Sequence, residues 1–161
     1  MTRLDAHFFK PFVDGTINTI KTMTSYEVNP LKPFIKGSRE QPEFAIAGVI
    51  GLTSSAFNGS ITLCFPKKVF LGIISRMLGE DFKEITEDMQ DGAAELLNII
   101  YGHAKAILNN QGYTIQKAIP TVIVGNALKT THLGSNPTMV LAFETELGEL
   151  HIEISSEPNT P

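Results

Sequence analysis

Three polar side chains recur at helical spacing in the stretch Asp91-Gly-Ala-Ala-Glu-Leu-Leu-Asn98. At about 100° per residue, Glu95 and Asn98 lie within roughly 40° of Asp91, so all three share one narrow stripe of a helix. An amide carries a donor and an acceptor on one short planar group, so Asn98 can orient a water molecule. A carboxylate such as Glu95 can form an ion pair with a lysine. The stripe therefore predicts a surface that places a water molecule against a group held by another protein.

Hydrolysis of an acyl phosphate is the reaction that such a surface suits. If a partner protein holds the acyl phosphate and its own metal ion, catalysis needs only a water molecule placed in line with the phosphorus. Positioning alone can lower a barrier by about 7 kcal/mol or more, so a single amide can suffice. The plainer alternative is that Glu95 and Asn98 are simply solvated, as exposed polar residues of helices usually are.

Small residues border this stripe, namely Gly92, Ala94, Gly102 and Ala106. Each glycine inside a helix costs about 1 kcal/mol relative to alanine, so a local gain is expected to offset the two glycines. A smooth helix surface with one carboxylate and one amide suits contact with another protein. We therefore expect Asp91, Ala94 and Gly102 to belong to a docking surface.

One long helix must carry the stripe. Thr86 is the expected N-cap, and the acidic Glu87 and Asp88 follow in the first turn, where they suit the positive end of the helix dipole. The helix should end near residues 109–112. Its opposite side is apolar and should face the core through Met89, Ala93, Leu96, Ile100, Ala104 and Ile107.

The residues before this helix predict a helix, an extended segment, a hairpin and a second helix. The first helix should span about residues 5–23, and the prolines of residues 25–35 favour an edge strand. Asn58-Gly59 is a turn signal inside the expected hairpin of residues 43–65. Pro66 should open the next helix at its first position, and Gly79 should end it.

The residues after the long helix predict strands only. Residues 113–125 should be extended, with Pro120 in the middle. A second hairpin is expected around Leu147-Gly148, from residue 138 to residue 155. The polar tail of residues 156–161 should be frayed.

The two halves of the chain resemble one another. Tyr26 aligns with Tyr113 and Pro33 with Pro120 at a constant offset, which predicts pseudo-repeats over about residues 5–65 and 86–155 with a bridging helix over about 66–80. Neither half can cover its own sheet face, so residues 1–161 should form one domain with both repeat helices packed on one sheet. Gly15 and Asn18 match Glu95 and Asn98, so only the second half should carry the carboxylate.

Composition excludes several classes of function. The net charge of −4 leaves no basic surface for a nucleic acid. We find no signal peptide and no apolar run near the ~20 residues of a membrane span, so the expected location is the cytoplasm. The single cysteine, Cys64, is expected to be a buried small hydrophobe. No metal-ligand spacing links the four histidines, and His103 is expected to lie at the rim of a helix.

The spacing Asp91-x3-Glu95-x2-Asn98, followed by Pro120, resembles the signature of the CheC/CheX/FliY family of chemotaxis phosphatases. The single-site layout is similar to the CheX type. Further runs look like the same family, from about Leu4 to Ile154: Asn18-Thr-Ile-Lys-Thr-Met23, Phe65-Pro-Lys-Lys-Val69, Met77-Leu-Gly-Glu80 and Ile119-Pro-Thr-Val-Ile-Val-Gly125.

The resemblance implies a CheC-like α/β (α+β) fold with about six strands and long helices packed on the sheet, and a homodimer. It implies removal of the phosphoryl group from the aspartate of a CheY-type response regulator. Asn98 would orient the water and Glu95 would pair with the regulator's lysine, while Asp91 and Pro120 would shape the site. The Mg²⁺ ion would belong to the regulator, with no cofactor or metal bound by this chain itself.

Two alternatives remain open from the sequence. A non-catalytic adaptor would use the same helix to bind a receiver domain or another signalling protein. The Glu95/Asn98 pair favours the phosphatase, because binding alone would not require an amide beside the acid. A dimeric scaffold with a merely solvated stripe would bind no receiver domain at all.

Overall fold

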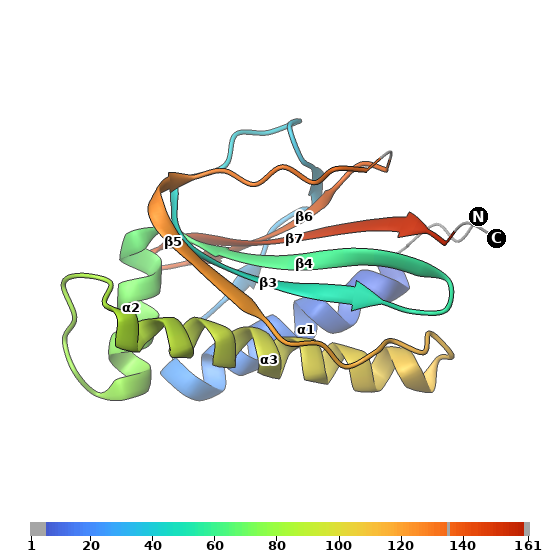
Figure 1. Ribbon diagram of the computed structural model, residues 1–161. Coiled ribbons are helices and arrows are strands. Elements are labelled where there is room, and N and C mark those ends of the chain that lie inside the picture. Colours follow the sequence, from blue (N-terminus) through green and yellow to red (C-terminus); the bar gives the residue numbers. More distant parts are fainter. Residues whose placement is uncertain (1–5, 135, 160–161) are drawn as a thin grey trace.

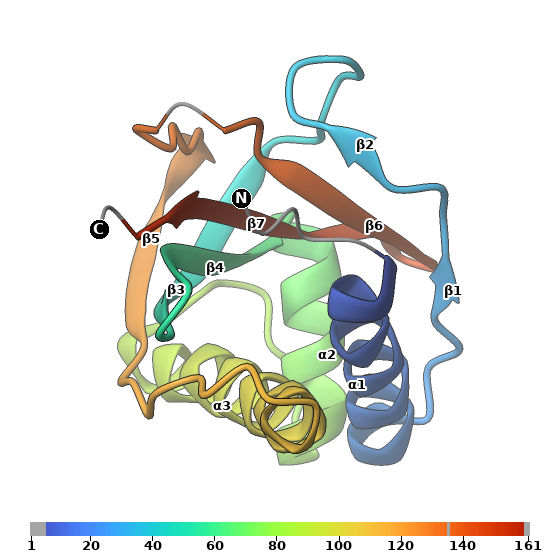
Figure 2. The ribbon, with the colours of Figure 1, turned by 90° about the vertical axis from the view of Figure 1, so that its right-hand side faces the viewer.

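A computed structural model describes residues 6–134 and 136–159, which fold into one antiparallel sheet with helices on one face (Figures 1 and 2). The helices are α1 (Ala6–Thr24), α2 (Lys67–Leu78) and α3 (Glu87–Asn110). The strands are β1 (Asn29–Pro30), β2 (Phe34–Ile35), β3 (Phe44–Thr53), β4 (Phe57–Phe65), β5 (Thr121–Leu128), β6 (Met139–Thr145) and β7 (Gly148–Pro158).

The seven strands occupy six positions in the order β1-β6-β7-β4-β3-β5, because the short β1 and β2 both pair with β6. The predicted mixed fold, with about six strands under long helices, is therefore confirmed. The strands β1 and β2 are only two residues long because Pro30 and Pro33 have no N–H group to donate to a neighbouring strand.

The core lies between the helices and the inner face of the sheet. Side chains from all three helices and from β3, β4, β6 and β7 are buried there, among them Phe8, Phe12, Ile50, Ile61, Phe70, Leu96, Ile100, Phe143 and Ile152. Burying such apolar side chains is the main favourable term in folding. In the described part of the chain, no helix has the length and apolar character that crossing a membrane requires.

The predicted helices form where the end signals placed them. Thr86 is the N-cap of α3, and Gly79 ends α2 in the left-handed region with φ 72°. Pro66 is the N-cap of α2 rather than its first residue, a difference of one position. Asp5, where the first helix was predicted to begin, lies outside the described residues.

The turn predicted at Asn58-Gly59 was wrong, because both residues belong to β4. The chain turns at Ser54 instead, whose Oγ accepts hydrogen bonds from the N–H groups of Ala56 (3.1 Å) and Phe57 (3.2 Å). Gly59 is needed for another reason. A Cβ atom there would lie 1.9 Å from the carbonyl oxygen of Ser155, so glycine lets β4 and β7 approach.

Two further predictions about strands were wrong in part. The strand after α3 begins only at Thr121, because side-chain and backbone hydrogen bonds hold the preceding segment against α3 and β3. Asn109 bonds to both the N–H and the C=O of Ile115, and the N–H of Gln116 bonds to the C=O of Thr53. The tail is not frayed through residues 156–158, which continue β7 beside β4, while residues 160–161 lie outside the described part.

The strand order supports the predicted repeat, which stays a prediction. Exchanging the two halves maps β1 onto β5, β3 onto β6 and β4 onto β7, and this exchange leaves the order β1-β6-β7-β4-β3-β5 unchanged. We propose on this basis that residues 1–161 form one domain of two interleaved halves with α2 as the bridge.

A buried carboxylate organises the sheet face away from the helices. Glu153 on β7 is fully buried and accepts hydrogen bonds from Lys36, Gln41 and His132 at 2.9 Å, and from the hydroxyl of Thr130. The donors come from the segment between β2 and β3 and from the loop between β5 and β6. Both segments cross this face of the sheet (Figure 1), so the hydrogen bonds to Glu153 hold both of them against the sheet.

These hydrogen bonds set the ionisation of Glu153. Burial alone would raise the pKa of Glu153, but the bonds from His132, Thr130, Lys36 and Gln41 outweigh burial and lower the pKa from 4.5 to about 2. A carboxylate whose pKa is lowered by folding stabilises the protein above its unfolded pKa. That stabilisation is lost as the pH falls through the folded pKa.

We therefore predict that the free energy of unfolding falls by about 3 kcal/mol through Glu153 between pH 5 and pH 2. Urea titrations at a series of pH values measure it. Glu153→Gln should be less stable at neutral pH and should lack this part of the acid dependence. Glu144→Gln, at an exposed position on the neighbouring strand β6, is the matched control and should retain it. Identical acid profiles for all three proteins would contradict the prediction.

Candidate functional site

The predicted stripe forms on α3 and faces away from the core. Asp91, Glu95 and Asn98 are exposed, and their side chains form no hydrogen bond or ion pair with another described residue. The residues on the opposite side of the same helix, including Leu96 and Ile100, are fully buried. The carboxylates and the amide are therefore free to contact a partner.

The two glycines beside the stripe serve different purposes. Gly92 faces α2, and a Cβ atom there would lie 2.1 Å from Cδ1 of Ile74, so internal packing accounts for this glycine. Gly102 is exposed, and nothing lies within 4 Å of a Cβ atom built on it. Packing within the chain gives no reason for a glycine at position 102, whereas a partner lying against the helix would.

Two exposed hydrophobic side chains extend this region beyond the residues predicted from the sequence. Ile99 is 37% exposed beside Asn98, and Ile119 is 87% exposed beside the half-buried Pro120. Pro120 immediately precedes β5, which contacts α3 where the strand begins and then rises away from the helix (Figures 1 and 2). The sequence did indicate that Ile99 is exposed, because helical spacing places it about 80° from Asp91, outside the arc of core residues.

The first helix presents no second copy of the carboxylate. Gly15, which matches Glu95 in the predicted repeat, is buried where α1 packs on α3, and a Cβ atom there would lie 3.0 Å from Cδ2 of His103. A glutamate at position 15 would therefore meet the His103 ring. His103 itself is exposed at the rim of α3, as predicted.

Neither the single cysteine nor a metal site gives a second candidate centre among the described residues. Cys64 is buried as predicted, and burial raises the pKa of its thiol, which suppresses the reactive thiolate. Among residues 6–134 and 136–159, no three His, Cys, Asp or Glu side chains are grouped so that they could hold a metal ion. The arrangement on α3 can dock a partner and orient a water molecule, and it does not activate a nucleophile of its own.

The family model of the chemotaxis phosphatase CheX matches residues 46–144, which include the whole stripe. This chain belongs to the CheX family. The matched region runs from β3 through α3 to β6, so it covers both the site helix and the strands beneath it.

Relatives within the CheX family match nearly the whole chain. The CheY-P phosphatase CheX of Thermotoga maritima is 25% identical over 155 residues, which cover 95% of this chain and 99% of that protein. The crystal structure of CheX from Vibrio vulnificus is 32% identical, covers 94% of this chain and all of that chain, and superposes with a TM-score of 0.87. A complex of CheX with CheY, BeF3 and Mg²⁺ from Borrelia burgdorferi shares the fold, with 20% identity, a TM-score of 0.79 and coverage of 96% and 99%.

We predict that Gly102→Ala raises the free energy of unfolding by about 0.5–1 kcal/mol, because alanine removes the helix cost of glycine and meets no other atom. Thermal or urea unfolding measures the change. Gly92→Ala is the matched control in the same helix, and its gain should be smaller because Ile74 must move. Equal gains at the two positions would contradict the different roles assigned to these glycines.

Proposed function

We propose that this protein hydrolyses the aspartyl phosphate of a CheY-type response regulator. The observation that carries the proposal is the exposed Glu95/Asn98 pair on α3, which has no partner among the described residues, in a chain of the CheX family. Support also comes from the Thermotoga maritima relative, which is a CheY-P phosphatase by name. The exposed side of α3 is smooth and convex, a shape that suits contact with the phosphorylation site of the regulator.

Each residue of the stripe has a role in this proposal. Asn98 orients the attacking water through its amide, which can accept from and donate to that water at once. Glu95 pairs with the lysine of the regulator and thereby sets the register of docking. Asp91, Ala94 and Gly102 line the contact on α3, and Pro120 shapes its edge at the start of β5. No charge on this chain needs to change during the reaction.

We assign the Mg²⁺ ion to the regulator and no cofactor to this chain. Mg²⁺ prefers near-octahedral oxygen ligands, and the carboxylates of Asp91 and Glu95 are one helical turn apart on a solvated surface. A metal bound at the aspartyl phosphate would neutralise charge on the phosphoryl oxygens. The contribution of α3 is then the position of the water.

The decisive experiment measures phosphate release from a Mg²⁺-bound regulator phosphorylated by acetyl phosphate. Wild-type protein should accelerate release, and Asn98→Ala should reduce that acceleration by about 100-fold or more, because the water loses its orienting group. Docking of the phosphorylated regulator, measured by titration, should be retained. Asn18→Ala, which removes an exposed amide from α1, is the matched control and should keep full activity.

A second variant separates docking from chemistry. Glu95→Gln should weaken binding of the regulator, because the ion pair with its lysine is lost. If wild type and Asn98→Ala bind the regulator equally and neither accelerates phosphate release, the protein is a non-catalytic adaptor. If neither binds, the stripe is a solvated surface and the proposal fails.

We further propose a homodimer in the cytoplasm, where the regulator would also reside. Support comes from β5, which among the described strands pairs only with β3 and has no described strand on its other edge. Ile123 and Val124 on this strand are 44% and 41% exposed. An open strand edge with apolar side chains favours pairing with a second strand, here one from a second copy.

Replacing Val124 by lysine should convert the dimer into a monomer, because a charge on the open edge opposes strand pairing. Light scattering after gel filtration measures the mass. Thr53→Lys, at an exposed position in the neighbouring strand β3, is the control and should leave the dimer intact. A wild-type protein that is monomeric at all concentrations would contradict this part of the proposal.

A further inference from the structure

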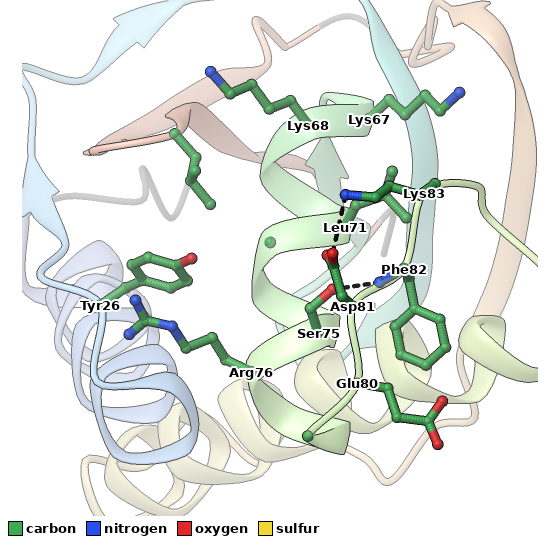
Figure 3. Close-up of a pocket in the computed structure, with 13 residues that line it drawn as sticks. Tyr26, Lys67, Lys68, Leu71, Ser75, Arg76, Glu80, Asp81, Phe82 and Lys83 are labelled. Atoms are coloured by element: carbon green, nitrogen blue, oxygen red, sulfur yellow. Dashed lines mark hydrogen bonds and ion pairs between the residues drawn. The ribbon is translucent and has the colours of Figure 1, made fainter.

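A groove of about 990 Å³ runs along the outer side of α2, away from the stripe on α3. Tyr26 and Arg76 lie on one side of the helix, while Asp81, Phe82 and Lys83 lie on the other (Figure 3). The volume is that of sites which hold a small ligand or a short peptide. The groove has no role in the proposed phosphatase reaction.

The floor of the groove is apolar because Leu147 packs directly on Gly72. Gly72 lies midway along α2, and a Cβ atom there would approach Cδ1 of Leu147 to 2.1 Å. Leu71, Leu147 and Phe82 are only half-buried, so each keeps apolar surface toward the groove. Partly exposed apolar side chains gathered in one concave place are typical of a binding surface.

Two of the cations that line the groove already have carboxylate partners. Lys67 pairs with Glu84 at 2.7 Å, and Lys83 pairs with Asp81 at 3.0 Å. Both pairs lie on the side of α2 that faces the link to α3. The only other acid of the lining, Glu80, lies on this same side of the groove (Figure 3).

The other side of the groove carries two cations without a carboxylate partner. Lys68 forms no hydrogen bond or ion pair with another described residue. The guanidinium of Arg76 stacks on the Tyr26 ring at 4.0 Å and donates to the carbonyl oxygen of Thr24 at 3.0 Å. These contacts hold Arg76 in place and leave its positive charge uncompensated, in a chain whose net charge is −4.

The spacing of these cations indicates the shape of the ligand. Lys68 and Arg76 are eight residues apart on one side of α2, which is about 12 Å along the helix. In an extended peptide, acidic side chains four residues apart lie on the same face and are separated by about 13 Å. The residue midway between them shares that face and would lie against Leu147, which covers Gly72. A free phosphate or other small anion would reach only one of the two cations.

We propose that this groove binds an extended, acidic and hydrophobic segment of another protein. Two of its carboxylates pair with Lys68 and Arg76, and the apolar side chain midway between them packs against the exposed parts of Leu71 and Leu147. The site is separate from the Glu95/Asn98 stripe, so it gives this protein a second contact for recruiting a partner. It holds whether or not α3 is catalytic.

The test uses the whole protein, labelled with ¹⁵N, and the peptide acetyl-Glu-Ser-Leu-Ser-Glu-amide, whose two glutamates and leucine share one face when the peptide is extended. Amide shifts should change in α2 and residues 79–83 and saturate with added peptide. Lys68→Glu with Arg76→Glu should weaken binding at least 10-fold. Lys117→Glu with Lys129→Glu changes the net charge equally at exposed positions outside the groove, and should weaken binding less than 2-fold.

Two further arms keep the outcome decisive. Lys68→Glu alone removes no side-chain hydrogen bond or ion pair within the described residues, and it should weaken binding at least 3-fold without changing the unfolding midpoint. The neutral peptide acetyl-Gln-Ser-Leu-Ser-Gln-amide should bind at least 10-fold more weakly. The proposal is overturned if no shifts occur or if the shifts lie outside the groove. It is also overturned if the neutral peptide binds as tightly as the acidic peptide, or if the control variant weakens binding as much as Lys68→Glu with Arg76→Glu.

Discussion

Burial of one face of α3 against the sheet is the constraint on which the site depends. Leu96 and Ile100 are fully buried, and the geometry of a helix then directs residues half a turn away into solvent. The hydrophobic effect therefore orients Glu95 and Asn98 without any contact to them. A helix held along its length by the core is also rigid, and rigidity is what an amide needs if it is to place a water molecule.

Catalysis by positioning a water molecule does not require this chain to enclose the reacting group. The reacting group and its metal are proposed to belong to the regulator, so this chain needs a convex surface that enters the partner's site. Gly102 suits that shape, since nothing in the described part of the chain requires a glycine there.

The packing of α1 on α3 decides which half of the chain can carry the carboxylate. Gly15 lies against the His103 ring, so the position that matches Glu95 in the predicted repeat is used for the contact between α1 and α3. Gly72 lets Leu147 pack directly on α2, and this leucine forms the apolar floor of the groove. Glycines thus serve two ends in this molecule: close packing at Gly15, Gly72 and Gly92, and an open surface at Gly102.

Local signals and periodicity were enough to predict the three helices, the ends of α2 and α3 to within one residue or two, the existence of the two hairpins and the stripe of Asp91, Glu95 and Asn98. The sequence could do this because helix caps, alternation and helical spacing depend on neighbours along the chain. It could not predict that the turn falls at Ser54, that β5 begins after Pro120, or that Glu153 gathers Lys36, Gln41, Thr130 and His132. Those features depend on which strands lie side by side, and only the tertiary structure brings together residues that are up to 117 positions apart.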